Sequence, residues 1–274
     1  MSLIVLTSAS GSPGVTATAL GLALTWSRPV MLVEADPTGG SAVCAGYLRG
    51  ATTPPDSLID LALAHREGGL LAALPQVTMT LQGSSVTLLP GTRSHEQARS
   101  LLGLWEPLTG ALKSLERTGQ DVIVDAGRLG LYGWPEPLVY GADLTLLVTR
   151  TDLVSLSGAR SWAETLRGRF ERIGACPSLG VLLVGEGEPY RTREVAKLLQ
   201  VPVVASLAWD PEAAAVLAKG AEPPRPSALQ RLADRNPFDD SALLRSVRAA
   251  RTAVQATIAT NRDHLQAAPA GRQT

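Results

Sequence analysis

The sequence predicts an α/β protein with a doubly wound, mostly parallel sheet flanked by helices in three layers. Short apolar, β-branched runs alternate with helical patterns along most of the chain, which is typical of parallel sheets. The first apolar run, residues 3–8, is followed by a glycine-containing turn and a helical pattern over residues 16–26. A strand, helix and strand joined in this way form a right-handed parallel unit. At 274 residues the chain is long enough to bury a proper core.

The expected elements follow from apolar runs, capping residues and breakers. Strands are expected at residues 3–8, 29–34, 85–91, 121–127, 143–149, 179–184 and 201–206. Helices are expected at residues 16–26, from Ser57 as N-cap, at 95–117 with an interruption near Pro107, and at 155–170, 194–199, 213–218 and about 241–265. Gly220 is expected to end the helix at 213–218.

The chain divides by composition into a main domain and a C-terminal part. Residues 1–220 carry the alternating strands and helices, and residues 221–235 are rich in Pro and Arg. The sequence pattern of residues 221–266 therefore predicts a connection followed by a helix. One face of that helix is apolar, so it is expected to pack on the same domain or on a partner. Residues 267–274 are expected to be a disordered tail.

The composition indicates the cellular compartment and limits the classes of partner. Lys and Arg total 25 and Asp and Glu total 25, so overall charge does not favour nucleic acid as a partner. Cys44 and Cys176 lie in unrelated contexts, which favours small core residues in a reducing cytosol over a metal site. No apolar run approaches the roughly 18–20 residues of a membrane-spanning helix. We expect a cytoplasmic protein without a transmembrane segment.

The turn at residues 10–16, here called the glycine turn, lies between the first strand and the first helix. In such a turn backbone N–H groups and the positive end of a helix converge on an anion. A working phosphate loop also needs a lysine, and Val15 stands at that position. Lysine occurs only at Lys113, Lys197 and Lys219. The turn alone is equally compatible with a small-residue connection that binds nothing.

Two aspartates follow strands that are expected to end beside the glycine turn. Asp36 comes after the strand at residues 29–34 and Asp125 ends an apolar run within residues 121–127. Ligands of open parallel sheets lie at the carboxyl ends of the strands. Asp36 is therefore a candidate to orient water or hydrated Mg²⁺, or else caps a turn before a helix near Ser41. Asp125 is a candidate to hold a metal through water.

With these motifs, the chain resembles the ParA/MinD family of partition and site-positioning ATPases, including its branch with degenerate phosphate loops. The resemblance runs from residue 3 to about residue 220. It rests on the turn at 11–16, on the sequence Glu-Ala-Asp-Pro-Thr-Gly-Gly-Ser at 34–41, on 122–125, and on the pattern from 201 to 220. It implies a P-loop NTPase-like fold and a homodimer with nucleotide between its subunits.

The resemblance also implies roles for single residues. The family's signature lysine falls on Ser10 and its loop lysine on Val15, so both are absent from this deviant Walker A sequence. Thr16 matches the hydroxyl that binds Mg²⁺, Asp36 the carboxylate linked to the attacking water, and Asp125 the carboxylate on the metal side. The nucleotide-binding residues would be Gly11, Ser12, Gly14, Val15 and Thr16. An Asn that reads adenine in the family falls on Gly185.

Three functional hypotheses remain open from the sequence. The favoured one is a pseudo-ATPase, a dimerising or adaptor component in positioning at the septum, cell pole, pilus or secretion machinery, or in chromosome partition, with an unknown protein partner. The second is a genuine but weak ATPase that binds ATP and Mg²⁺, with Arg93 or Arg150 replacing a lost lysine. The third is nonspecific DNA binding by a partition protein. Its contacts would be Arg245, Arg248 and Arg251.

Overall fold

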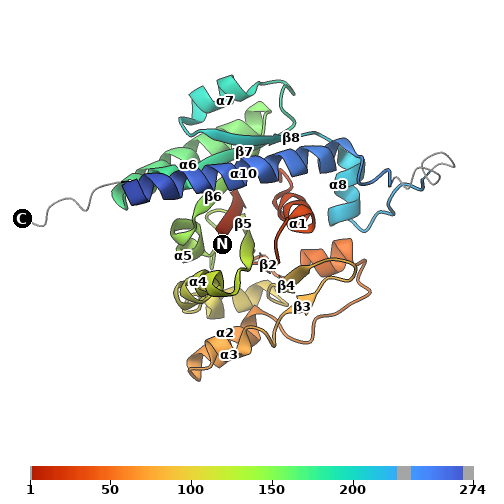
Figure 1. Ribbon diagram of the computed structural model, residues 1–274, viewed down its shortest axis with the longest axis vertical. Helices are drawn as coiled ribbons and strands as arrows, with labels where there is room; N and C mark the ends of the chain where they lie inside the picture. The colour runs from red at the N-terminus through yellow and green to blue at the C-terminus, as the bar shows by residue number, and fades with distance from the viewer. Residues whose placement is uncertain (1, 227–235, 268–274) are drawn as a thin grey trace, which may run out of the picture.

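The computed structural model describes residues 2–226 and 236–267. Within them the chain forms one eight-stranded sheet in the order β3-β4-β2-β5-β1-β6-β7-β8, with helices on both faces (Figure 1). All neighbouring strands are parallel except β3 and β4. The predicted fold class, a doubly wound and mostly parallel α/β sheet in three layers, is confirmed.

The strands agree closely with the apolar runs of the sequence. They are β1 (Leu3–Ser8), β2 (Val30–Glu34), β3 (Met79–Thr80), β4 (Val86–Leu89), β5 (Asp121–Arg128), β6 (Leu144–Arg150), β7 (Leu179–Val184) and β8 (Val203–Leu207). The two-residue β3 was not predicted from the sequence. It is short, half exposed and antiparallel, so it has no apolar run to mark it.

The sheet is buried on both faces, and each face has its own core. Along β1, Leu3 and Val5 face one cluster, whereas Ile4 and Leu6 face the other, as the two-residue period of a strand requires. Because both faces are covered, the strands read as continuous apolar runs and not as alternating ones. The sequence therefore reveals the strands but not which residue faces which layer.

The helices divide between the two faces of the sheet. They are α1 (Val15–Thr25), α2 (Leu58–Arg66), α3 (Leu70–Ala73), α4 (Trp105–Ser114), α5 (Glu136–Gly141), α6 (Leu153–Arg172), α7 (Thr192–Leu199), α8 (Pro211–Ala218) and α10 (Ala242–Ala267), with the short turns η1 (Val43–Tyr47), η2 (His95–Leu101), η3 (Leu115–Thr118) and η4 (Cys176–Ser178). Residues of α1, α8 and α10 share one core, and residues of α2 to α7 share the other.

Local signals predict some helix ends well and one poorly. Ser57 caps α2 as expected, because its Oγ accepts from the N–H of Ile59 and its own N–H donates to Asp60. The helical region expected at 95–117 is interrupted as predicted, but at residues 102–104, a few residues before Pro107. The break lies between η2 and α4, and α4 runs through Pro107. A proline in the first turn of a helix removes no intrahelical hydrogen bond, so the helix tolerates it there.

The C-terminal helix α10 packs on the main body of the chain. Its apolar face, formed by Leu243, Val247, Ala250, Val254 and Ile258, joins the core that contains α1 and α8. Figure 1 shows α10 running across the sheet beside β8 and α1. The tail was predicted at 267–274; Ala267 instead ends α10, and residues 268–274 lie outside the described residues, as does most of the Pro/Arg-rich connection. Among the helices of the described part, none is both long and apolar enough to cross a membrane.

The strand order creates a crevice beside β1. The chain leaves β1 toward β2 and leaves β5 toward β6, in opposite directions along the sheet. At such a switch point the carboxyl ends of neighbouring strands are not covered by their own connections. The glycine turn after β1 and the segment after β5 therefore border one open crevice.

Candidate functional site: a lysine-free phosphate-type turn

The glycine turn has the backbone of an anion-binding loop. Gly11, Ser12 and Gly14 all have positive φ angles, of 75°, 43° and 91°. Gly14 is the N-cap of α1 in the left-handed conformation, and its carbonyl accepts from the N–H of Thr18 at 2.9 Å. Consecutive turns of this kind direct backbone N–H groups into a common hollow at the positive end of α1.

The turn rests on the first turns of α6, a contact that the sequence did not reveal. A Cβ at Gly11 would overlap the side chain of Ser155, and a Cβ at Gly158 would overlap the hydroxyl of Ser10. Ser10 therefore points toward α6, and its Oγ has no hydrogen-bond partner among the described residues. The position that holds the signature lysine in the ParA/MinD resemblance is thus packed against a neighbouring helix.

Val15 closes the base of the turn with an apolar side chain. It is 6% exposed and belongs to the core shared by α1, α8 and α10. In a phosphate loop the lysine occupies this position, the first residue of the helix. In this chain the side chain at that position packs in the core, so the turn itself supplies no cation.

Thr16 and Asp125 lie together at the carboxyl end of β5. The hydroxyl of Thr16 donates to Oδ2 of Asp125 at 2.5 Å, and the N–H of Gly127 donates to Oδ1 at 3.0 Å. Burial raises the pKa of Asp125 to about 7, and the two hydrogen bonds oppose that rise. The protonated form of this carboxyl group therefore persists to higher pH than in an exposed aspartate.

These two side chains fit Mg²⁺ only in part. Their oxygens are of the hard type that Mg²⁺ prefers, and a cation would favour the ionised form of Asp125. Across residues 2–226 and 236–267, however, no group of three or more His, Cys, Asp or Glu side chains is placed to hold a metal ion. Bound Mg²⁺ would therefore need phosphate and water oxygens in addition to Thr16 and Asp125.

Asp36 follows β2, lies across from the glycine turn and contacts β5 at Gly127. Its Oδ1 accepts from the N–H of Thr38 at 2.9 Å, which closes a local turn after β2. The Asp36 carboxyl packs against Gly127, which has a φ of 60° and where a Cβ would overlap it. Asp36 does not cap the helical turn that follows. The hydroxyl of Ser41 caps that turn by accepting from the N–H of Cys44.

The glycine turn, the segment that follows β2, and the end of β5 with the residues after it border one cavity of about 450 Å³, here called the turn cavity. It is lined by residues 10–17, Ser8, Asp36, Thr38, Gly127, Arg128, Leu131 and Ala218. All five predicted nucleotide-binding residues and Asp36 line it, whereas Asp125 lies beneath it, bonded to Thr16. Its single Lys or Arg, among the residues the structure describes, is Arg128.

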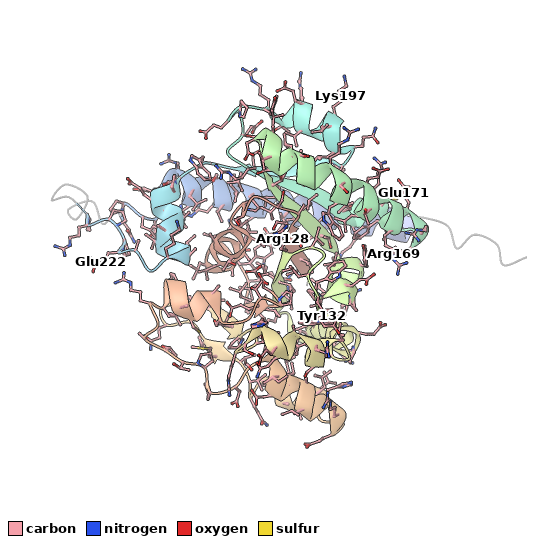
Figure 2. All side chains as sticks on the ribbon, turned by 180° about the vertical axis from the view of Figure 1, so that it is seen from behind. Arg128, Tyr132, Arg169, Glu171, Lys197 and Glu222 are labelled. Carbon is pink, nitrogen blue, oxygen red and sulfur yellow. The ribbon has the colours of Figure 1, made fainter. Side chains whose placement is uncertain are left out.

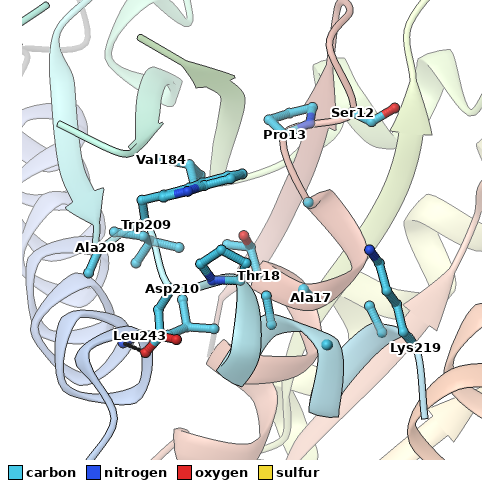
Figure 3. A pocket seen from close by; sticks show the side chains of 16 residues that line it. Ser12, Pro13, Ala17, Thr18, Val184, Ala208, Trp209, Asp210, Lys219 and Leu243 are labelled. Carbon is cyan, nitrogen blue, oxygen red and sulfur yellow. Dashed lines mark hydrogen bonds between the residues drawn. The ribbon is translucent and has the colours of Figure 1, made fainter. Parts of the chain in front are cut away.

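A second, apolar pocket of about 200 Å³ adjoins the turn cavity and shares residues 12–14, Ala17 and Ala218 with it. Figure 3 shows Trp209 and Lys219 on its walls, together with Val184 and Asp210. Gly185 follows Val184 and lies in van der Waals range of Trp209, at the place where the family resemblance expects Asn. This side pocket has the size and apolar lining to take a flat ring.

The two arginines considered as lysine replacements lie elsewhere. Arg93 donates to the carbonyl of Pro55 and lies 3.7 Å from Asp60. Arg150 lies over the ring of Trp209, 4.0 Å from its centroid, and 3.7 Å from Asp152. The cations that border the site are Arg128 and Lys219, which sequence reasoning missed. A lone Arg after a buried strand carries no local signal of where it points.

The three arginines of α10 make contacts within the chain. Arg245 donates to the carbonyl of Asp240 at 2.5 Å, and Arg248 to that of Asp239 at 2.6 Å. Arg251 donates to the carbonyl of Thr25, at the end of α1. Arg245 is exposed and the other two are half buried. They therefore do not form one freely projecting basic row.

The fold and the turn together define a class of structure: a three-layer α/β fold whose glycine turn has the backbone of a phosphate loop. No protein-family model matches the sequence, and no curated protein matches it significantly. Solved structures of MinD and ParA ATPases do share its fold. The cell division ATPase MinD of Pyrococcus furiosus superimposes with a TM-score of 0.68 at 19% identity, covering 93% of this chain and 99% of that one.

Two other structures give the same result. The septum site-determining protein MinD of Pyrococcus horikoshii, solved with Mg-ADP, has a TM-score of 0.68 at 18% identity, over 95% of this chain and 99% of that one. A ParA family ATPase from Chlorobium tepidum has a TM-score of 0.69 at 16% identity, over 92% and 99%. The chain thus has the fold of these ATPases over almost its whole length, at identities that speak for the fold alone.

Proposed function

We propose that the protein is a non-hydrolysing relative of the positioning ATPases, a pseudo-ATPase that acts in the cytoplasm as a dimerising or adaptor component in intracellular positioning. The setting would be the septum, cell pole, pilus or secretion machinery, or chromosome partition. The observation that carries the proposal is the glycine turn, whose two lysine positions hold a buried valine, Val15, and a serine, Ser10, packed on α6. Similar folds occur in MinD and ParA ATPases and in a MinC:MinD complex.

The loss of both lysines bears on turnover more than on binding. Phosphoryl transfer depends on positioning and charge stabilisation, and one missing cation of the arginine-finger type costs about 10³–10⁵ in rate. The turn backbone, Thr16, Asp36 and Asp125 still provide a place for phosphate and metal. A site of this kind either binds a nucleotide without hydrolysing it rapidly or binds no nucleotide.

A turnover assay tests this proposal. The purified protein and the variant Asp36→Ala would be incubated with Mg-ATP, and released phosphate would be measured. We expect phosphate release by both proteins to remain at the uncatalysed background. Without the two lysines, a water molecule oriented by Asp36 would have no charge-stabilised phosphoryl group to attack. Turnover in the native protein that Asp36→Ala abolishes would overturn the pseudo-enzyme proposal.

The dimer in this proposal is supported by an apolar pair beside the glycine turn. Leu153 and Val154 begin α6 and are 67% and 77% exposed, next to Ser155, which packs on Gly11. Exposed apolar side chains in such a place favour a protein contact. The double variant Leu153→Asp/Val154→Asp is expected to be monomeric by light scattering. The matched control is Leu71→Asp, at a 61% exposed leucine on α3.

A weak Mg-ATP-dependent ATPase is the second candidate, and the Thr16–Asp125 hydrogen bond favours it. The side pocket next to the turn cavity adds space for a base. Calorimetry with Mg-ATP distinguishes this candidate: micromolar binding together with turnover that needs Asp36 would establish it. Binding without turnover would agree with the first proposal.

DNA binding through α10 remains a third hypothesis without a specific observation in its favour. Phosphate contacts weaken steeply with salt, so DNA affinity should fall as salt rises and with loss of Arg245, Arg248 and Arg251. Affinity that is flat with salt, or that survives the triple substitution to Gln, would exclude this mode.

A further inference from the structure

We propose that Arg128 supplies the cation that the glycine turn has lost, so that the turn cavity still binds the phosphates of a nucleotide. This inference rests on the turn cavity of the proposed function and adds to it a residue on the opposite wall. The positive charge would come from the end of β5, whereas a phosphate-loop lysine comes from the start of α1.

An irregularity in the sheet brings Arg128 to the cavity. Leu6 of β1 pairs with Asp125, but Ser8 pairs with Arg128, so β5 has one residue more than β1 over this stretch. Such a bulge changes the direction of the side chains that follow it, because the face alternates with every residue. Paired residues lie on the same face, so Arg128 joins Asp125 on the side of α1. Without the extra residue, Gly127 would pair with Ser8 and Arg128 would face away.

Contacts around the bulge hold it in place. Gly127 adopts a φ of 60°, its carbonyl accepts from the hydroxyl of Thr7 at 3.1 Å, and its Cα lies against Asp36. The N–H of Leu129 then donates to the carbonyl of Ser8 at 2.8 Å, which returns the chain to β1. Arg128 therefore leaves from a backbone that is fixed on both sides.

The side chain of Arg128 is anchored at one end and free at the other. Its Nε donates to the carbonyl of Ala9 at 3.1 Å, directly before the glycine turn. Within the described residues the two Nη groups make no hydrogen bond and no ion pair. Figure 2 shows Arg128 projected over the middle of the molecule, whereas Lys197, Glu171 and Glu222 lie at its edges. A guanidinium held by Nε presents its remaining N–H groups as a fork, which suits phosphate oxygens.

The groups around the turn cavity do not by themselves provide a positive charge for phosphates. The turn cavity contains Asp36 and borders Asp125, and the glycine turn contributes only backbone dipoles. Lys219, from the end of α8, extends toward the start of α1 but lines the side pocket (Figure 3). Arg128 is thus the cation placed to meet phosphates in the turn cavity, and Lys219 is the one alternative the described structure offers nearby.

Titration calorimetry with magnesium pyrophosphate and with Mg-ADP tests the assignment. The variants are Arg128→Gln, Arg128→Lys and Lys219→Gln. The matched control is Arg193→Gln, because Arg193 is exposed on α7 and makes no hydrogen bond or ion pair with other described residues. Arg128→Gln is expected to weaken both affinities about tenfold to a hundredfold, the usual effect of a charge-assisted hydrogen bond. Arg128→Lys should recover most of the loss, and Arg193→Gln should change nothing.

The salt dependence separates a charge contact from a structural effect. Arg128→Gln should also lower the slope of log affinity against log salt, while its thermal unfolding matches that of the native protein. Three results would overturn the inference: equal affinities in Arg128→Gln and the native protein, loss of binding in Lys219→Gln alone, or no binding of either probe at millimolar concentration. Turnover is measured separately, so rapid hydrolysis that depends on Arg128 would refute the pseudo-ATPase and leave this assignment standing.

Discussion

Thr16 and Asp125, which are 109 residues apart in the chain, meet through a 2.5 Å hydrogen bond at the floor of the glycine turn. Thr16 lies in the first turn of α1 and Asp125 in β5. The parallel pairing of β1 with β5 brings them together, because it aligns the carboxyl ends of both strands. Their contact joins the turn to the strand that carries Arg128.

The buried Asp125 makes stability depend on pH. In the unfolded chain its pKa lies near 3.8, and in the folded protein near 7. Between these values the folded state keeps a proton that the unfolded state has released, so the free energy of unfolding falls as pH rises through this window. Asp125→Asn carries no charge and avoids that loss.

We therefore expect the native protein to lose stability relative to Asp125→Asn by about 2–3 kcal/mol between pH 5 and pH 8, because pH 5 already lies inside this window and the loss levels off above the folded-state pKa. Urea unfolding with chelator present, at both pH values, measures this difference. A difference between the two proteins that does not change with pH would contradict the raised pKa.

Restoring the missing lysine should increase nucleotide affinity. Val15→Lys places an ammonium group at the start of α1, facing the turn cavity, and we expect Mg-ADP to bind about tenfold to a hundredfold more tightly than to the control Val15→Met. Because Val15 is part of a core, both variants should lose about 1–3 kcal/mol of stability. Calorimetry gives the affinities. Equal affinities in the two variants would show that this wall of the cavity does not face phosphate.

Gly127 should tolerate no side chain. Its φ of 60° and its contact with Asp36 predict that Gly127→Ala lowers the free energy of unfolding by about 2–4 kcal/mol. Gly168→Ala is the matched control, because Gly168 lies within α6 with open space around its Cα, and alanine there should stabilise by about 0.5–1 kcal/mol. Denaturant unfolding measures both. A mild effect at Gly127 would argue against a rigid bulge.

The arginines of α10 should differ in their structural contribution. Arg251→Gln removes a donor from the carbonyl of Thr25, at the C-terminal end of α1, where a cation also favours the helix dipole. We expect a loss of about 1–2 kcal/mol. Arg245→Gln, at an exposed position, should change stability by less than about 0.5 kcal/mol. Thermal unfolding compares the two, and equal effects would mean that Arg251 does not secure α1.

The sequence by itself determined the fold class, most strands and the residues of the glycine turn. These depend on local patterns: apolar runs, the period of a helix, and caps such as Ser57 before α2. The absence of lysine near Val15 is likewise a fact of the sequence. The break near Pro107 was located only to within a few residues, because a proline signals a break only in a helix interior, and the start of α4 had no clear mark in the sequence.

Only the tertiary structure decided where the charges lie. The side chain of Arg128 reaches the turn cavity because β5 carries one residue more than β1, and such a shift of register depends on pairing between segments more than a hundred residues apart. The packing of Ser10 against Gly158 depends in the same way on how α6 lies on the glycine turn. Local patterns predict which segments form strands and helices, whereas the direction of a side chain at a bulge is set by contacts between distant parts of the chain.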